Sequence, residues 1–196
     1  MPAIPPDSDA IADTQAWLER AVIGLNLCPF AKAVHVRGQV HYAVCAATEP
    51  GALLQALEYE AKSLLALEPS ERDTTLLIAT GCLHDFLDFN AFLGRAERLL
   101  ARRGFDGVLQ LASFHPHYQF AGTEADDVTN CSNRTPWPTL HLLREASIDR
   151  AVEAFPDPEA IFGRNMAVLE QMGLAGWQAL DVGPGAGARR PAGEGA

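Results

Sequence analysis

The stretch TTLLIAT, residues 74–80, carries no charge and is followed at once by Gly81. A short apolar run that ends at a glycine predicts a strand covered on both faces. Further strands are predicted at residues 39–46 and 107–113. Strands of this kind need helices packed on both sides of their sheet. The stretch therefore favours an α/β fold.

Helical patterns separate the predicted strands. A helix that begins after Thr48 and Pro50 has apolar residues at every third or fourth position. A second helix has Asp88 as its expected cap and ends before Gly104. The alternation of strands and helices predicts right-handed crossovers and a mainly parallel sheet of three or four strands.

Three more helices are expected at the two ends of the chain. The first has an apolar face and ends near Cys28, because Pro29 follows; the face consists of Trp17, Leu18, Ala21, Val22 and Leu25. A helix over residues 138–155 is expected to cover the sheet. The last helix is capped by Asp157, has Pro158 at its first position and ends at Met172 before Gly173.

The chain is long enough for one domain, which we place at residues 9–181. Residues 1–8 contain three prolines, and residues 182–196 are almost entirely Gly, Ala, Pro and Arg. Both ends are too poor in large apolar side chains to order themselves, so we expect two disordered tails.

The net charge of -10 disfavours binding to nucleic acid and to anionic membrane surfaces, because like charges repel. The chain has neither an apolar run of about 20 residues nor a signal-like beginning, so we expect a cytoplasmic protein.

The four widely spaced cysteines form no CxxC pair. Without GxGxxG or GxxxxGK[ST], neither a nicotinamide, a flavin nor a P-loop nucleotide is expected as cofactor.

Residues 114–138 read FHPHYQFAGTEADDVTNCSNRTPWP. Residues 115–134, here called the polar loop, follow a predicted strand at the edge of the sheet where α/β proteins usually bind ligands. A loop of this length inside a domain is uncommon, and such loops are often functional. Its aromatic residues argue against disorder.

His115 and His117 flank a proline, which holds the chain extended and points both imidazoles to the same side. With Asp126 or Asp127 they would supply the ligands of a divalent metal ion, or one histidine would act as a general base. The alternative is that both histidines bond only to backbone and solvent.

Arg134 offers a guanidinium fork to an anion, and Asn130 and Asn133 add neutral donors nearby. The competing interpretation is that Arg134 pairs with Asp126 or Asp127 and only fixes the loop.

Three residues outside the loop are secondary candidates. His141 is four residues before Glu145, so on a helix the two would share a face. Cys28 is either a buried thiol or a nucleophile paired with His115 or His117. Asn165 lies on an apolar stripe, where a buried amide needs partners and could touch a ligand.

Three stretches of the chain carry a family resemblance: LNLCPFAK at residues 25–32, SFHPHYQFAGTEADDVTNCSNRTPWPTLHLLREAS at residues 113–147, and GRN at residues 163–165. With them the chain resembles the bacterial protein family called domain of unknown function 1415. The resemblance spans nearly the whole domain and leaves out the two tails. It implies that the polar loop, Cys28 and Asn165 belong to a family signature, but it carries no catalytic role over to them.

These observations lead to one main hypothesis and two alternatives. The main hypothesis is an enzyme that acts on a small anionic metabolite by hydrolysis or group transfer, with Arg134, Asn130 and Asn133 binding the anion. His115 or His117 would be the general base or a metal ligand, and Asp126 and Asp127 would orient the histidines or complete a metal site. The alternatives are a binding module that uses the loop to recognise a protein, and a purely structural loop whose polar groups satisfy one another.

Overall fold

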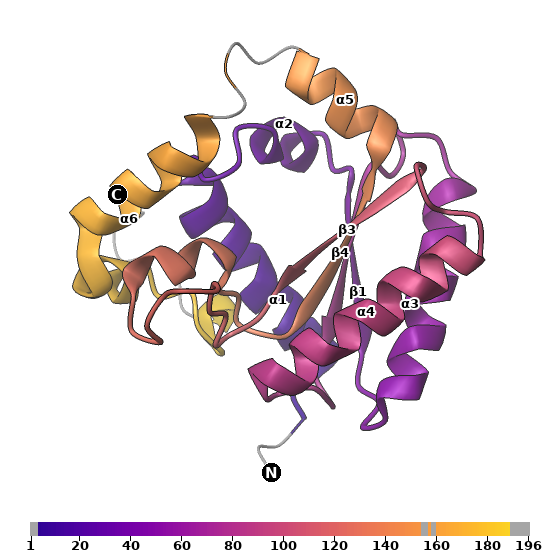
Figure 1. Cartoon of the computed structure of the whole chain (residues 1–196), viewed down its shortest axis with the longest axis horizontal. Coiled ribbons are helices and arrows are strands. Elements are labelled where there is room, and N and C mark those ends of the chain that lie inside the picture. The colour runs from indigo at the N-terminus through magenta and orange to yellow at the C-terminus, as the bar shows by residue number, and fades with distance from the viewer. Residues whose placement is uncertain (1–3, 154–156, 158–159, 189–196) are drawn as a thin grey trace.

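The computed structural model describes residues 4–153, 157 and 160–188. Its centre is a four-stranded sheet with the strand order β1-β2-β4-β3. The strands are β1 (Val40–Cys45), β2 (Thr74–Ala79), β3 (Leu109–Phe114) and β4 (Thr139–Arg144) (Figure 1). The α/β class and the three strands predicted from sequence are confirmed.

The prediction of a mainly parallel sheet is wrong, because β4 runs antiparallel to both of its neighbours. β1 pairs with β2 in parallel, whereas β4 pairs antiparallel with β2 on one side and β3 on the other. The expected helix over residues 138–155 begins instead as this strand. In its sequence TLHLLR, Leu140 and Leu142 are fully buried on one face and His141 points to the other. Such alternation has the period of a strand, and Phe155 lies outside the described residues.

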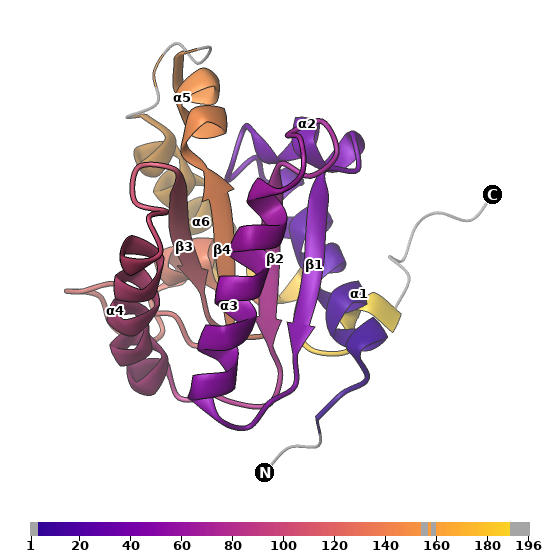
Figure 2. The ribbon, with the colours of Figure 1, turned by 90° about the vertical axis from the view of Figure 1, so that its right-hand side faces the viewer.

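Helices α3 (Pro50–Leu65) and α4 (Phe86–Arg102) cover one face of the sheet (Figure 2). Leu53, Leu57 and Phe89 are fully buried between these helices and the strands. The cap of α4 is Asp85 and not Asp88, because the Asp85 side chain accepts hydrogen bonds from two backbone N–H groups of the first turn. This face holds the larger hydrophobic core.

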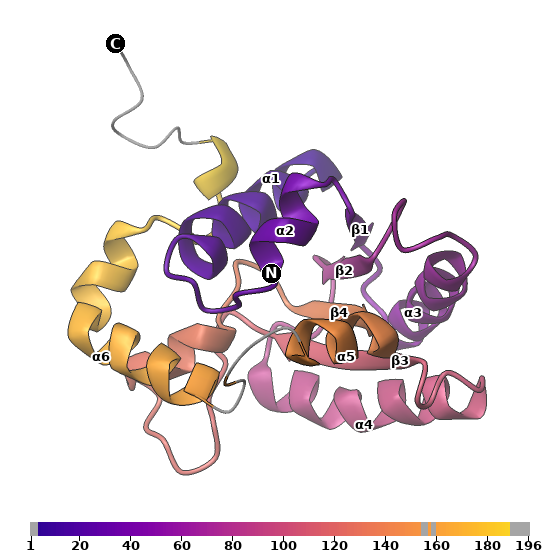
Figure 3. The same ribbon diagram turned by 90° about the horizontal axis from the view of Figure 1, so that it is seen from above.

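The other face is covered less completely. Helix α1 (Asp7–Trp17), its continuation as the π-helix η1 (Leu18–Ile23), and α2 (Ala31–Val36) lie on this side (Figure 3). The ring of Trp17 packs edge-on against Phe114, with 5.2 Å between centroids. The first helical segment ends at Ile23, earlier than the expected end near Cys28.

Helices α5 (Glu145–Glu153) and α6 (Ala160–Ala179) follow the sheet in sequence. The Asp157 side chain accepts a hydrogen bond from the Ala160 N–H at 3.2 Å, which confirms it as a cap, while Pro158 is outside the described residues. Gly173 has a φ of 66°, so the helical geometry breaks there as expected. Of the described residues, none belongs to a helix long and apolar enough to cross a membrane.

Residues 182–188 lie against α1. Val182 and Ala186 are buried, and the short 3-10 helix η3 (Ala186–Ala188) lies beside α1 (Figure 3). The buried Asp13 carboxylate accepts hydrogen bonds from the N–H groups of Gly185 and Gly187, each at 2.9 Å. It also accepts one from the Trp137 indole at 3.2 Å. One carboxylate therefore joins α1 to two distant segments.

Replacement of Asp13 by alanine is expected to lower the free energy of unfolding by about 3 kcal/mol, because three donors lose a charged acceptor. Urea denaturation measures the change. The matched control is Glu97→Ala on the exposed side of α4, which is expected to change stability by no more than about 0.5 kcal/mol. Equal effects of the two substitutions would contradict the role given to Asp13.

Candidate functional site

The polar loop connects β3 to β4 and is held together by its own hydrogen bonds. Asn130 is fully buried. Its Oδ1 accepts from the Phe120 N–H at 2.9 Å and the Thr123 hydroxyl at 2.8 Å, and its Nδ2 donates to the Glu124 carbonyl at 2.8 Å. The amide thus closes the loop on itself, and because it is fully buried it presents no surface to a ligand.

Arg134 also bonds within the loop. Its Nε donates to the Tyr118 carbonyl at 3.2 Å and its Nη2 to the Ala125 carbonyl at 2.6 Å. It fixes the loop as the competing interpretation expected, but through carbonyls, since it forms no ion pair with an acidic side chain in the described ranges. Asp126 is exposed.

Asp127 caps the 3-10 helix η2 (Val128–Asn133). Its Oδ1 accepts from the Thr129 hydroxyl at 2.7 Å and the Thr129 N–H at 2.9 Å. These bonds, with a smaller contribution from the positive charge of Arg134, lower the pKa of the carboxyl. Its oxygen is used for capping rather than for orienting a histidine.

His115 is fully buried, and both of its ring nitrogens have partners. Nδ1 accepts from the His117 N–H at 3.0 Å, so the ring proton of the neutral imidazole is on Nε2, which lies 3.1 Å from the Leu83 carbonyl. The ring packs between Phe86 and Phe89. Burial lowers the pKa of His115 to about 4. The imidazole is neutral and already saturated with hydrogen bonds.

The two histidines of the loop do approach each other, with 6.0 Å between ring centroids. However, the part of the chain that the structure describes contains no group of three or more His, Cys, Asp or Glu side chains arranged to hold a metal ion. With both nitrogens of His115 engaged, a metal at this pair would require the histidine to give up a partner.

The structure does not bring Cys28 to His115. Adjacent residues of a strand point to opposite faces, and Phe114 contacts Trp17 on one face while His115 contacts Phe89 on the other. Cys28 lies on the Phe114 side, in the same cavities as that ring. His141 and Glu145 do not share a helix face, because His141 is within β4.

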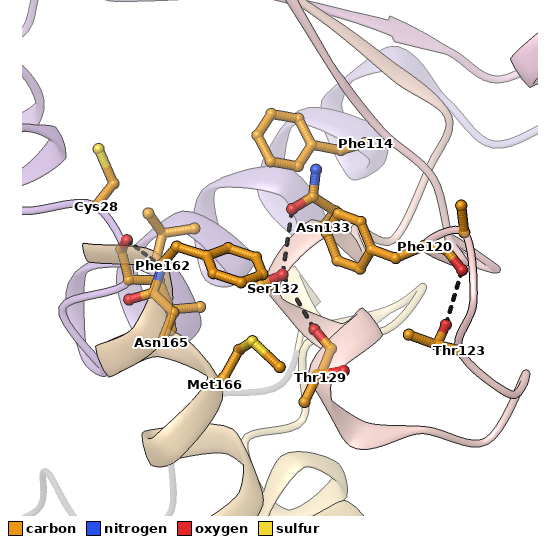
Figure 4. A pocket seen from close by; sticks show the side chains of 13 residues that line it. Cys28, Phe114, Phe120, Thr123, Thr129, Ser132, Asn133, Phe162, Asn165 and Met166 are labelled. Atoms are coloured by element: carbon orange, nitrogen blue, oxygen red, sulfur yellow. Dashed lines mark hydrogen bonds between the residues drawn. The ribbon is translucent and has the colours of Figure 1, made fainter. Parts of the chain in front are cut away.

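A cavity of about 630 Å³ lies between the polar loop, the segment around Cys28 and α6; we call it the loop cavity (Figure 4). All three stretches that carry the family resemblance meet here. Cys28 comes from the first, Asn133 from the second and Asn165 from the third. Asn165 holds the first stretch in place, since its Nδ2 donates to the Leu27 carbonyl at 2.8 Å.

The walls of the loop cavity are mostly apolar, and its polar groups are neutral. Phe120, Phe162 and Met166 line it together with hydroxyl and amide side chains (Figure 4). The Ser132 hydroxyl lies 3.1 Å from the Thr129 carbonyl and 3.2 Å from the Asn133 Oδ1. The hydroxyls of Thr123 and Thr129 also donate within the polar loop, to the Phe120 carbonyl and the Asp127 carboxylate. The cavity therefore offers shape and apolar surface more than charge.

A second cavity of about 750 Å³ lies over the less covered face of the sheet; we call it the sheet cavity. Its apolar walls include Trp17, Leu76, Ala112 and Phe114. It shares Val22, Cys28 and Phe114 with the loop cavity, so the two cavities adjoin at these residues. Cys28 is thus the one sequence-predicted site residue that borders both.

Charged residues of the sheet cavity gather where β1 and β2 begin. They are Arg37, Arg144, Arg150 and Asp73, which sum to +2 in a chain whose net charge is -10. None of these arginines forms an ion pair with a described acidic residue. Arg37 and Arg150 are exposed, and their guanidinium groups donate to the neutral side chains of Gln39 and Ser147 respectively. Arg144 donates to the carbonyls of residues 64, 67 and 72.

His141 lies in the sheet cavity beside Phe114, with 6.1 Å between ring centroids. Its Nε2 is 2.6 Å from the Thr74 hydroxyl. Burial lowers the pKa of His141 to about 4, so the imidazole is neutral at pH 7. Burial also raises the pKa of Cys28, although hydrogen bonds from the N–H groups of Phe30 and Ala31 partly oppose this, so the sulfur is a thiol.

The sequence did not single out Thr74 or the arginines of the sheet cavity. Thr74 belongs to the run TTLLIAT, which we interpreted only as a buried strand. A buried threonine hydroxyl needs a hydrogen-bond partner, and this signal could have drawn attention to Thr74. Arg37 is far in sequence from Arg144, which ends β4, and from Arg150 in the adjoining α5, and no spacing signals that Arg37 meets the other two.

His115 generates a prediction on stability. In the unfolded chain a histidine binds a proton below about pH 6.5, whereas folded His115 binds one only below about pH 4. Between these two pH values protonation favours the unfolded state, so the contribution of His115 to the free energy of unfolding falls as the pH drops. The slope is at most about 1.4 kcal/mol per pH unit. Urea denaturation of His115→Gln should show less stability at pH 7 and a shallower decline toward pH 4.

The control for this prediction is Phe92→Leu, a core substitution that removes no titratable group. It should lower the whole pH profile without changing its slope. If His115→Gln and Phe92→Leu both run parallel to the wild type, His115 is not the source of the decline.

Comparison with known proteins gives one match. The family model described as "Protein of unknown function (DUF1415)" matches residues 9–179. No curated protein matches the chain, and no solved structure does. The matched region contains the sheet, the polar loop and all of α6, so the family model spans the elements that build both cavities. The chain therefore belongs to the DUF1415 family of proteins of unknown function.

Proposed function

We propose that the protein binds a small amphipathic anion, a molecule with an apolar body and one carboxylate or phosphate group, in the sheet cavity. The observation that carries this proposal is the group of three arginines without carboxylate partners among the described residues, at one end of an otherwise largely apolar cavity. A small anion is the ligand class expected from the sequence, but the proposed site is not the polar loop.

Electrostatics supports the position of the anionic group. Asp73 offsets part of the repulsion among the arginines, since its Oδ1 accepts from the Ser147 hydroxyl at 2.6 Å and this hydroxyl accepts from Arg150 at 3.0 Å. The remaining charge of +2 is unpaired among the described residues, and an anion placed between the arginines relieves their repulsion. Arg37 and Arg150 are exposed and can turn their planar guanidinium groups toward a carboxylate or phosphate. Arg144 is held in place by carbonyls and contributes a fixed positive charge.

The size and lining of the cavity support an apolar body. A volume of about 750 Å³ lies within the range of small-molecule sites, roughly 300–1,000 Å³. Ala112, Phe114 and Leu143 are only partly buried and offer apolar surface, and each Å² of ligand surface removed from water there contributes about 25 cal/mol. The arginines would fix the orientation of the ligand, and the walls would supply affinity.

For the polar loop we propose a structural role, in which its polar groups satisfy one another and close the end of the sheet. The internal bonds of Asn130, Arg134 and Asp127 support it. A protein-recognition role would instead need these groups to be presented outward.

Hydrolysis or group transfer on the bound anion is a second candidate function. It is favoured by one observation: a neutral histidine, His141, and the thiol of Cys28 line the same cavity. Such groups are used as general bases and nucleophiles. The binding function needs neither residue to react, so it remains our main proposal.

The binding proposal is tested by isothermal titration calorimetry with straight-chain carboxylates and alkyl phosphates of six to twelve carbons. We expect saturable binding that weakens with salt, and an affinity at least about 100-fold lower in Arg37→Gln/Arg150→Gln, since charge-assisted hydrogen bonds contribute about 1.5–3 kcal/mol each and two of them are lost. Arg102→Gln at the end of α4 is the matched control on the opposite face of the sheet. Loss of affinity in the control to the same degree would contradict the proposal.

A second substitution tests the apolar part of the site without changing charge. Ala112 lines the sheet cavity from β3, and Ala112→Leu would fill part of it. We expect binding to be abolished while the thermal midpoint stays within a few degrees of the wild type. Ala112→Ser adds little volume and should retain binding. Unchanged affinity in Ala112→Leu would place the anion on the surface and outside the cavity.

A further inference from the structure

His141 is in the middle of β4, on the face that borders the sheet cavity. Its partners in register are Leu76 on β2 and Ala112 on β3, and all three residues line the cavity. Leu76 and Ala112 present only apolar surface to a ligand. The imidazole is therefore the polar group at the centre of this row of the sheet.

The hydrogen bonds of Thr74 determine which nitrogen of His141 carries the proton. The Thr74 Oγ1 lies 2.6 Å from the Leu142 carbonyl and 2.6 Å from the His141 Nε2. A carbonyl can only accept, so the single hydroxyl proton of Thr74 goes to Leu142. The hydroxyl oxygen must then accept from Nε2, which places the ring proton there and the lone pair on Nδ1.

Nδ1 is left as an acceptor without a partner. No residue in the ranges 4–153, 157 and 160–188 forms a hydrogen bond to this nitrogen. The hydrogen bond of the imidazole in these ranges joins Nε2 to the Thr74 hydroxyl. Protonation does not remove the lone pair at neutral pH, because burial lowers the pKa of His141 to about 4. Nδ1 is not among the buried side-chain atoms that lack a partner, so it is open to the sheet cavity and can accept a hydrogen bond from a molecule there.

We propose that His141 Nδ1 accepts a hydrogen bond from a hydroxyl or N–H group on the body of the bound anion. This inference rests on the proposed function and narrows the ligand class: the molecule carries a neutral donor on its apolar part in addition to its anionic group. His141 is then a specificity-determining residue, and Thr74 is the positioning residue that fixes its tautomer.

The arrangement selects against ligands that lack the donor. A site built to bond a hydroxyl leaves its own polar group unsatisfied when the analogue without that hydroxyl binds. A ligand with the donor in the wrong place buries it against the apolar surface of Leu76 or Ala112 and loses affinity. Selectivity should therefore depend on where the donor is along the chain.

The experiment compares octanoate with the seven monohydroxyoctanoates, hydroxylated at carbons 2 to 8, by calorimetric titration of the full chain. We expect at least one isomer to bind about ten-fold more tightly than octanoate. His141→Phe should bind octanoate and that isomer equally. Thr74→Val should reduce the preference, and Thr74→Ser, which keeps the hydroxyl, should retain it.

A second measurement uses the wild-type protein, so it does not depend on the folding of the His141 variant. The ¹⁵N spectrum of the imidazole of His141 in the wild type should show the proton on Nε2. The Nδ1 resonance should shift when the preferred hydroxyoctanoate binds and not when octanoate binds. A proton found on Nδ1 in the free protein would overturn the proposal.

The results separate this inference from the proposed function. If octanoate binds but no isomer binds more tightly, or if His141→Phe keeps the preference, the role of His141 is wrong and the anion site stands. If none of these anions binds and none shifts the Nδ1 resonance, both proposals are overturned.

Discussion

The structure depends on the insertion of β4 between β2 and β3. The side chains of Leu140 and Leu142 fill the core under α3 and α4, and each is fully buried. The backbone of β4 satisfies the inner edges of two strands that would otherwise leave unpaired N–H and C=O groups inside the protein. Without this strand, β3 would have no neighbour in the sheet, and the polar loop would lose one of its two anchors.

The two faces of the sheet are covered unequally, and this places the candidate site. Two long helices lie against one face, whereas the other is covered mainly by α1, η1 and the short α2. Side chains on the second face, such as Thr74 and His141, therefore border space instead of a helix. The arginines gather where β1 and β2 begin, which is the opposite end from the polar loop and from the carboxyl ends where α/β ligands usually bind.

The polar loop shows how chemically rich residues can be used for structure. His115, Asn130 and Arg134 all lie in one loop, yet each is occupied by partners from the loop or its neighbouring turn. A long connection without regular strands or helices has many backbone groups that water does not reach, and polar side chains satisfy them. The polar loop held in this way forms one wall of the loop cavity, beside Cys28 and Asn165.

The sequence by itself determined the α/β class, three of the four strands and the family, because buried strands, helical periodicity and long motifs are local signals. It also identified the loop whose residues meet Cys28 and Asn165. Tertiary structure decided that residues 139–144 form a strand, because this strand forms only where the edges of β2 and β3 lack hydrogen-bond partners. It likewise decided that His115 is saturated while His141 has a free nitrogen among the described residues. Which polar groups are satisfied depends on partners far away in the chain, and no local pattern records them.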